Sequence, residues 1–145
     1  MRVLIIEDEK PATKKLELLL KKYDQTIEIL NRISTVSKSI EYIQTNQTNI
    51  DLIFLDIQLT DGLSFDIFKS VKVEKPIIFT TAFNEYAIEA FKLNSIDYLL
   101  KPVSFENLKQ ALDKINSMYD NLPVDKPKTN ISLDQITKLL SGNSQ

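Results

Sequence analysis

Neither cysteine nor histidine occurs among the 145 residues of the chain. Without cysteine the protein has no disulfide bonds, no thiolate metal sites and no cysteine nucleophile. Without histidine it has no imidazole to serve as an acid–base catalyst. The chain also lacks a long apolar segment near its start, since acidic residues directly follow the apolar run from Val3 to Ile6. Such a run is far too short for a signal peptide or a membrane span, so we expect a cytoplasmic protein without membrane contact.

Charge of either sign is not in large excess, since 18 basic and 20 acidic residues leave a formal net charge of −2. This balance gives no electrostatic reason to expect that the chain itself binds nucleic acid or an acidic membrane. The apolar share of 43% and the charged share of 26% are typical of a soluble globular protein. The length is sufficient for one domain with its own hydrophobic core, followed by a short tail.

Apolar runs typical of buried strands alternate with segments of helical periodicity along residues 1–120. The expected strands cover residues 3–6, 27–33, 51–56, 77–82 and 96–100. The expected helices cover about residues 11–23, 37–44, 65–71, 85–93 and 104–118. Five consecutive strand–helix units predict an α/β fold, in which helices cover both faces of a five-stranded parallel sheet.

Several of the expected strands end in residues that can carry chemistry. These residues are Glu7 and Asp8 after the first strand, Asp56 in the third, Thr81 and Ala82 in the fourth, and Lys101 after the fifth. In open parallel sheets the functional crevice lies at the carboxyl ends of the strands. If strands one, three, four and five are neighbours, all these groups converge on one pocket.

The convergence of three carboxylates predicts a bound cation, because each carboxylate raises the pKa of the others unless their charge is neutralised. Mg²⁺ binds carboxylate, water and phosphate oxygens, and Mn²⁺ is expected to substitute for it. Asp56 can then act as a nucleophile that forms an acyl phosphate. Mg²⁺, Lys101, the Thr81 hydroxyl and a backbone N–H near Ala82 would neutralise and position the phosphoryl group.

At these residues the sequence resembles the receiver domains of two-component response regulators. The matching motifs are Glu7-Asp8, Asp56 in DLIFLDIQL, Thr81-Ala82 in IIFTTAF, and Lys101-Pro102 in DYLLKP. The resemblance covers residues 1–120 and implies the flavodoxin-like, doubly wound (βα)5 receiver fold with strand order 2-1-3-4-5. It also implies metal ligands at Glu7, Asp8, Asp56 and the backbone carbonyl of Gln58. It further implies a cis peptide between Lys101 and Pro102, and a switch pair formed by Thr81 and Tyr98.

The segment IIFTTAFNEYAIEAFKLNSIDYLLKPVSFENL narrows the resemblance to LytR/AgrA-like regulators, whose output is a LytTR-type DNA-binding domain. Residues 121–145 have the composition of a linker and tail, so we expect the output domain, and any DNA contact, beyond this chain. The implied partner is a sensor histidine kinase that supplies the histidine missing here. The resemblance also implies a phosphorylation-linked homodimer through the fourth helix, fifth strand and fifth helix.

Two features depart from the commonest receiver pattern. The first acid is Glu7 instead of aspartate, which changes how the waters of the metal are held. The loop after Asp56 reaches Gly62 early and has Thr60 where proline is common. These departures concern the geometry of the loop and the metal site more than the chemistry.

Other readings fit parts of the pattern. A phosphatase or phosphotransferase for outside substrates needs a second acid near its nucleophile, but Ile57 and Gln58 follow Asp56. A pure interaction module would have lost the phosphorylation residues, which are intact here. Thr80 is an alternative to Thr81, and Tyr98 is also compatible with simple packing. The leading prediction is a signalling switch that catalyses only its own phosphorylation and dephosphorylation.

Overall fold

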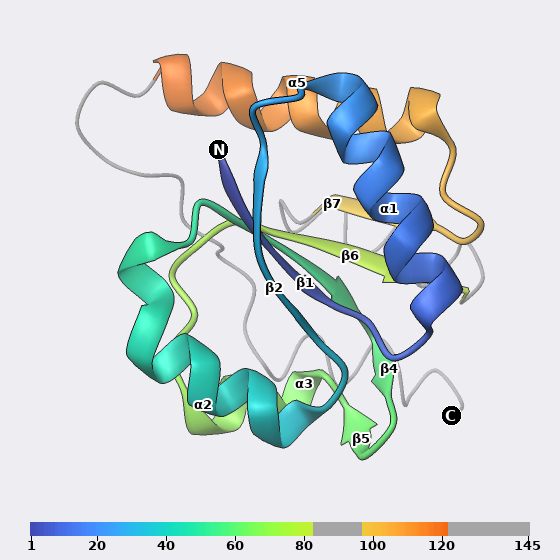
Figure 1. Cartoon of the computed structure of the whole chain (residues 1–145). Helices are drawn as coiled ribbons and strands as arrows, with labels where there is room; N and C mark the ends of the chain where they lie inside the picture. Colours follow the sequence, from blue (N-terminus) through green and yellow to red (C-terminus); the bar gives the residue numbers. More distant parts are fainter. Residues whose placement is uncertain (83–96, 122–145) are drawn as a thin grey trace, which may run out of the picture.

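The computed structural model describes residues 1–82 and 97–121, with side chains as far as residue 118. In this part of the chain five parallel strands form one sheet in the order β2-β1-β3-β6-β7. Helices lie on both faces of the sheet (Figure 1). Since β6 and β7 are the fourth and fifth strands of the sheet, the predicted order 2-1-3-4-5 and the doubly wound architecture are confirmed. The helix predicted at residues 85–93 and the tail from residue 122 lie outside the described residues.

The bounds of the elements lie close to those expected from the sequence. The strands of the sheet are β1 (Arg2–Ile6), β2 (Glu28–Ile33), β3 (Leu52–Asp56), β6 (Ile77–Thr81) and β7 (Asp97–Leu100). The helices are α1 (Lys10–Tyr23), α2 (Val36–Asn46), α3 (Phe65–Ser70) and α5 (Phe105–Asn121), with a 3₁₀ turn η1 at Gln47–Asn49. A small hairpin of β4 (Gln58–Leu59) and β5 (Gly62–Leu63) follows β3.

The central strands are buried on both faces, which explains their unbroken apolar sequences. Every residue of β3 and β6 is buried. On one face of the sheet, strand residues such as Ile5 pack with Leu16 of α1 and with apolar residues of α5. On the other face, residues such as Leu4 pack with Ile43 of α2 and Ile67 of α3. Because successive strand residues point to opposite faces, this alternation also decides which face each strand-end side chain joins.

Local sequence features fix where the helices begin. Pro11 occupies the first turn of α1, where a missing backbone N–H costs nothing. The hydroxyl oxygen of Thr35 accepts a hydrogen bond from the N–H of Lys38 at 3.2 Å and caps α2. At α5 the hydroxyl oxygen of Ser104 accepts a hydrogen bond from the N–H of Asn107 at 3.2 Å and caps the helix.

Residues 57–62 were expected to form a loop, but the structure places the β4–β5 hairpin there. Gln58 pairs with Leu63, and Leu59 pairs with Gly62. Gly62 has a φ of +149°, a conformation that L side chains rarely adopt, and a Cβ there would lie 3.4 Å from Oδ2 of Asp66. Two-residue strands are too short to produce a periodic apolar pattern, which is why the sequence did not reveal them.

Candidate functional site

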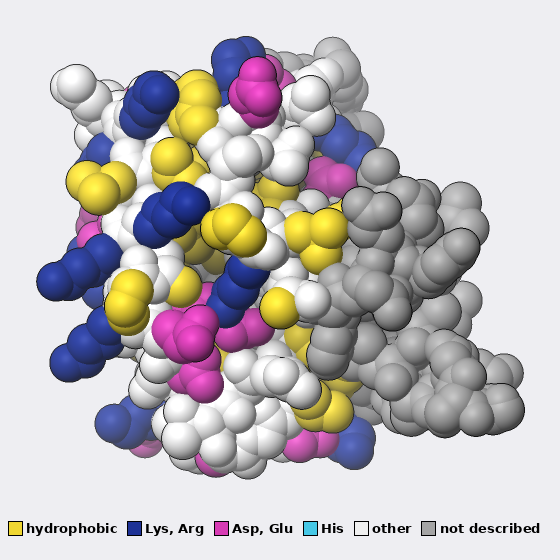
Figure 2. Space-filling view, turned by 90° about the vertical axis from the view of Figure 1, so that its right-hand side faces the viewer, with side chains coloured by type: hydrophobic (Ala, Val, Ile, Leu, Met, Phe, Trp, Pro, Cys, Tyr) yellow, Lys and Arg dark blue, Asp and Glu magenta, His cyan; other side chains and the backbone are white. Residues whose placement is uncertain are grey.

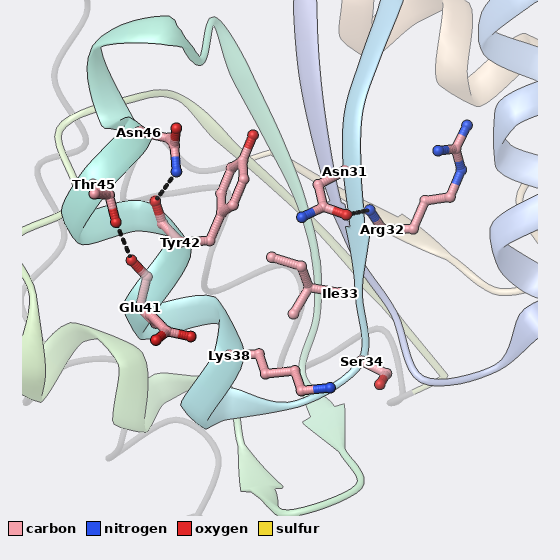
Figure 3. Close-up of a pocket in the computed structure, with 9 residues that line it drawn as sticks. All are labelled: Asn31, Arg32, Ile33, Ser34, Lys38, Glu41, Tyr42, Thr45 and Asn46. Carbon is pink, nitrogen blue, oxygen red and sulfur yellow. Dashed lines mark hydrogen bonds between the residues drawn. The ribbon is translucent and has the colours of Figure 1, made fainter.

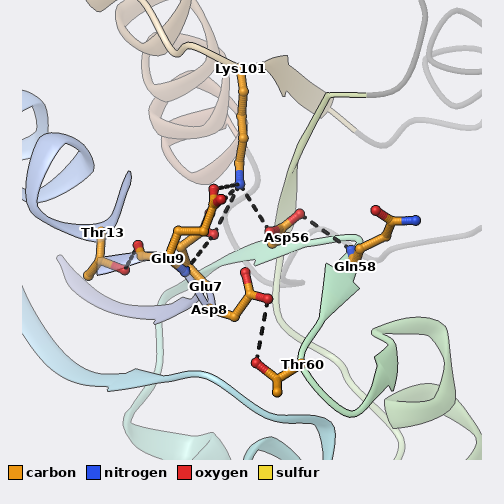
Figure 4. A network of polar contacts seen from close by, with 8 residues as sticks. All are labelled: Glu7, Asp8, Glu9, Thr13, Asp56, Gln58, Thr60 and Lys101. Atoms are coloured by element: carbon orange, nitrogen blue, oxygen red, sulfur yellow. Dashed lines mark hydrogen bonds and ion pairs between the residues drawn. The ribbon is translucent and has the colours of Figure 1, made fainter. Parts of the chain in front are cut away.

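The carboxyl ends of neighbouring strands bring four charged side chains together at one edge of the sheet. Glu7 and Asp8 follow β1, Asp56 ends β3, and Lys101 follows β7. Figure 4 shows their side chains pointing toward one another. Figure 2 looks onto this edge and shows acidic side chains gathered beside a basic one. Glu7, Asp8, Asp56 and Lys101, four of the six residues expected to converge, therefore lie in one cluster.

Lys101 lies at the centre of this group. Its Nζ is 2.9 Å from Oε1 of Glu7 and 3.0 Å from Oδ2 of Asp56. A longer contact of 3.5 Å joins Nζ to Oε1 of Glu9. The side chains of Glu7 and Asp56 are only 5% and 9% exposed, so their charges depend on the neighbouring ammonium for compensation.

The close packing of these groups changes their acidity. Burial raises the pKa of Glu7 to about 7, and the nearby charge of Asp56 also raises it. The hydrogen bond from Lys101 lowers this pKa but does not outweigh the burial. Burial also opposes the charged form of Lys101, but hydrogen bonds to Glu7 and Asp56 outweigh it and hold the pKa of the ammonium above its ordinary value. Lys101 therefore stays protonated at neutral pH, where Glu7 titrates.

The three acids are arranged to hold a cation. Glu7, Asp8 and Asp56 each offer one carboxylate oxygen, and these oxygens lie within 4.8 Å of one another. Such a set of oxygen donors suits a hard divalent cation and offers no nitrogen or sulfur ligand to a softer metal. Two of the acids are buried and Asp8 is partly exposed, so one side of the cluster is open to water. The donor set therefore fits Mg²⁺.

The backbone after Asp56 folds back toward the acidic cluster. The N–H of Gln58 donates to Oδ1 of Asp56 at 3.4 Å, and the hydroxyl of Thr60 donates to Oδ2 of Asp8 at 3.5 Å. The Lys101–Pro102 peptide bond is cis, as the resemblance implies. The part of the Gln58 carbonyl as a metal ligand stays a prediction.

Thr80 and Thr81 at the end of β6 point to opposite faces of the sheet. Thr80 and the exposed Ala82 line a cavity of about 450 Å³ between α1 and the segment that precedes α5. Thr81 shares the face of Phe79, which packs in the core beside α2 and α3, and Tyr98 packs against the same core. Thr81 and Tyr98 therefore lie on one face of the sheet, whereas Thr80 lies on the other, and the switch pair stays a prediction.

Sequence reasoning missed two residues of the cluster. Glu9 occupies the N-cap position of α1, and its carboxylate also approaches Lys101. Thr60 was noted only as a departure from the family pattern, and its contact with Asp8 depends on the hairpin. A third acid directly after Glu7-Asp8 was the one signal in the sequence for Glu9.

A second hollow, of about 570 Å³, lies between the edge strand β2 and α2 (Figure 3). Asn31, Ile33, Lys38 and Tyr42 are among the residues that line it. None of the predicted site residues belongs to this lining. The acidic cluster and the cavity beside it therefore share no lining residue with this hollow.

Comparison with known proteins decides the family. The model of the response regulator receiver domain family matches residues 3–113. The chain belongs to this family. It is a receiver domain of two-component signalling, and its predicted identity is confirmed.

Curated relatives of this receiver domain are LytT and LytR proteins. The sensory transduction protein LytT of Bacillus anthracis is 36% identical over 117 residues, which cover 79% of this chain and 46% of that protein. The transcriptional regulatory protein LytR of Staphylococcus aureus is 35% identical over 146 aligned positions, covering 99% of this chain and 55% of that protein. The receiver domain thus spans about half the length of the curated relatives it matches.

Solved structures agree with the receiver fold. The response regulatory domain of mrkE from Klebsiella pneumoniae has a TM-score of 0.67 and 32% identity, over 83% of this chain and 98% of that one. A two-component response regulator from Clostridium difficile has a TM-score of 0.66 and 28% identity, over 83% of this chain and 99% of that one. Within residues 1–82 and 97–121, no helix has the length and apolar character needed to cross a membrane.

Proposed function

We propose that this receiver domain accepts a phosphoryl group on Asp56 from a partner sensor histidine kinase, in a reaction that needs Mg²⁺. The observation that carries the proposal is the environment of Asp56. Its buried carboxylate lies 3.0 Å from Nζ of Lys101 and shares a cluster of oxygens within 4.8 Å with Glu7 and Asp8. A carboxylate held between an ammonium and a cation site can receive a dianionic group, because the added charge is neutralised on both sides.

In the proposed reaction an oxygen of Asp56 attacks the phosphorus of the donor. A P–O bond forms on Asp56 while the P–N bond to the donor imidazole breaks, and the imidazole leaves with the electron pair. Glu7, Asp8, Asp56 and the backbone carbonyl of Gln58 would hold Mg²⁺, or Mn²⁺ in its place. The metal supplies positive charge to the phosphoryl oxygens.

The remaining residues neutralise the phosphoryl group and report its presence. Lys101 stays protonated at neutral pH, so its ammonium can pass from the Asp56 carboxylate to a phosphoryl oxygen. The Thr81 hydroxyl and the N–H of Ala82 donate to the other oxygens. When Thr81 moves toward the phosphoryl group, Tyr98 turns inward on the same face of the sheet. This change of shape is the signal that the domain passes on.

The switch would control homodimerisation and, through it, a LytTR-type DNA-binding domain outside this chain. Support comes from the relatives, of which the aligned part covers only 46% and 55%, and which include a protein named as a transcriptional regulator. The expected dimer face includes β7, α5 and the helix predicted at residues 85–93, which lies outside the described residues. We expect the domain to act in the cytoplasm, to contact neither membrane nor DNA directly, and to catalyse only its own phosphorylation and dephosphorylation.

Intact-mass spectrometry after incubation with acetyl phosphate and Mg²⁺ tests the proposal. The native chain should gain one phosphoryl adduct, whereas Asp56→Asn, or the native chain in EDTA, should gain none. Asp66→Asn is the matched control, because it removes an exposed carboxylate on α3 and should leave the adduct unchanged. An adduct that persists in Asp56→Asn, or that forms equally well in EDTA, would contradict the proposal.

A further inference from the structure

The β4–β5 hairpin connects the acidic cluster to the start of α2. It begins two residues after Asp56, and Thr60 and Asp61 form its tip. On the side of the cluster, the N–H of Gln58 reaches Asp56 at 3.4 Å and the Thr60 hydroxyl reaches Asp8 at 3.5 Å (Figure 4). Both the first strand of the hairpin and its tip therefore border the site.

Asp61 joins the tip of the hairpin to α2. Its Oδ1 accepts a hydrogen bond from the N–H of Val36 at 2.6 Å, and its Oδ2 accepts from the N–H of Ser37 at 3.2 Å. These N–H groups belong to the first turn of the helix, where the helix itself offers no acceptor. The bonds from Val36 and Ser37 hold the pKa of Asp61 below its usual value, so the carboxylate is charged at neutral pH and favoured by the helix dipole.

Both ends of this connection are firmly held. In α2 the side chains of Val36 and Ile43 are buried in the core beside the sheet. In and next to the hairpin, Ile57 is fully buried and Leu59 is 7% exposed. Because the apolar residues are fixed in the core and the tip is fixed on α2, the hairpin has little freedom to move relative to Asp56.

We infer that Asp61 is a positioning residue for the metal centre. By fixing the tip of the hairpin on α2, it sets where the Gln58 backbone and the Thr60 hydroxyl stand beside the acidic cluster, and thereby the affinity for Mg²⁺. The inference rests on the proposed function, in which the Gln58 carbonyl binds the metal. Coupling between two sites is reciprocal, so Mg²⁺ bound at the cluster also strengthens the contact between Asp61 and the first turn of α2.

Calorimetric titration of the whole chain with MgCl₂ at constant ionic strength gives the first test. Asp61→Ala removes both acceptors, and we expect it to weaken Mg²⁺ binding by about fivefold, a modest coupling. Asp61→Asn keeps one oxygen that accepts from Val36 but loses the charge, and it should weaken binding by less than about twofold. Equal weakening by both variants that disappears at high salt would show an effect of charge alone and would overturn the inference.

Asp24→Ala is the matched control for the loss of an exposed acid that accepts a backbone hydrogen bond. Asp24 is an exposed acid that accepts from the N–H of Thr26 at 2.9 Å, much as Asp61 accepts from α2. It follows the last residue of α1, whereas Glu9 precedes the first, so the length of the helix, about 20 Å, separates it from the cluster. This variant loses the same charge and should bind Mg²⁺ as the native chain does.

Hydrogen exchange at the amides of Val36 and Ser37 gives a second readout that is independent of phosphorylation. Saturating Mg²⁺ should slow their exchange in the native chain and leave it unchanged in Asp61→Ala. If Mg²⁺ does not change the exchange rates of these amides in the native chain, the inference is overturned, even if Asp61→Ala fails to fold. If the native chain binds no Mg²⁺, the proposed function fails as well. If it binds Mg²⁺ and Asp61→Ala binds it equally tightly, only the role of Asp61 fails.

Discussion

Replacing Lys101 by methionine removes the positive charge from the centre of the acidic cluster while it keeps the length of the side chain. Nζ of Lys101 lies within 3.0 Å of Glu7 and Asp56, whose side chains are 5% and 9% exposed. Removing one partner of a buried ion pair costs about 3–5 kcal/mol. Because the Lys101 side chain is itself 19% exposed and water therefore reaches the pair, we expect a loss of about 3 kcal/mol at pH 8, the lower end of that range.

The loss of stability in Lys101→Met should depend on pH, because Glu7 changes its charge near pH 7. The pKa of Glu7 is raised from 4.5 to about 7 in the folded chain, so between these values the folded state binds more protons than the unfolded state. Stability therefore increases as the pH falls from 8 through 7. The hydrogen bond from Lys101 lowers the pKa of Glu7, and its removal raises this pKa further. The deficit of Lys101→Met should consequently be smaller at pH 6 than at pH 8.

Urea denaturation followed by circular dichroism, at both pH values and with or without Mg²⁺, measures these effects. Mg²⁺ should stabilise Lys101→Met more than the native chain, because the cation replaces the missing charge. Lys72→Met is the control: its Nζ lies 3.5 Å from Glu74, its side chain is 86% exposed, and its loss should leave stability nearly unchanged. A Lys101→Met chain as stable as the native one at pH 8 without metal would show that Lys101 does not compensate the buried charges of Glu7 and Asp56.

Two further predictions concern the fold. Glu17→Gln removes an ion pair in which Oε2 of Glu17 lies 2.6 Å from Nε of Arg32. The hydrogen bond from Arg32 lowers the pKa of Glu17, so the stabilisation is present at neutral pH and decreases in acid. In urea titrations we expect the variant to be about 0.5 kcal/mol less stable at pH 7, with a deficit that shrinks as the pH falls below 4.5. Phe79→Ala removes a fully buried ring that packs edge-on against Phe65 at 5.9 Å, and it should cost about 3–5 kcal/mol; a loss near zero would contradict its place in the core.

Much of the fold follows from local patterns in the sequence. The run from Leu52 to Leu55 predicts a strand buried on both faces, and every residue of it is buried. Ser104 predicts the start of α5, and its hydroxyl caps that helix. The order of the strands is different, because it depends on long-range pairing that no local pattern encodes. It was available from the resemblance to receiver domains.

The candidate site was predictable as a set of residues but not as a set of contacts. Asp56 and Lys101 stand out because each lies where an apolar strand ends, yet they are 45 positions apart, and their contact at 3.0 Å depends on strand order. The contact of Thr60 with Asp8 and the capping of α2 by Asp61 span 52 and 25 positions. They depend on a hairpin too short to leave a sequence pattern. The raised pKa of Glu7 likewise follows from burial, which only the packed structure shows.

Locating the phosphorylated residue tests whether Asp56 accepts the phosphoryl group. After reaction with acetyl phosphate and Mg²⁺, borohydride reduces an aspartyl phosphate to homoserine, which peptide mass spectrometry can place in the sequence. We expect homoserine at position 56 and at no other position. Homoserine at Asp8 or at another acidic residue, with Asp56 unchanged, would contradict it.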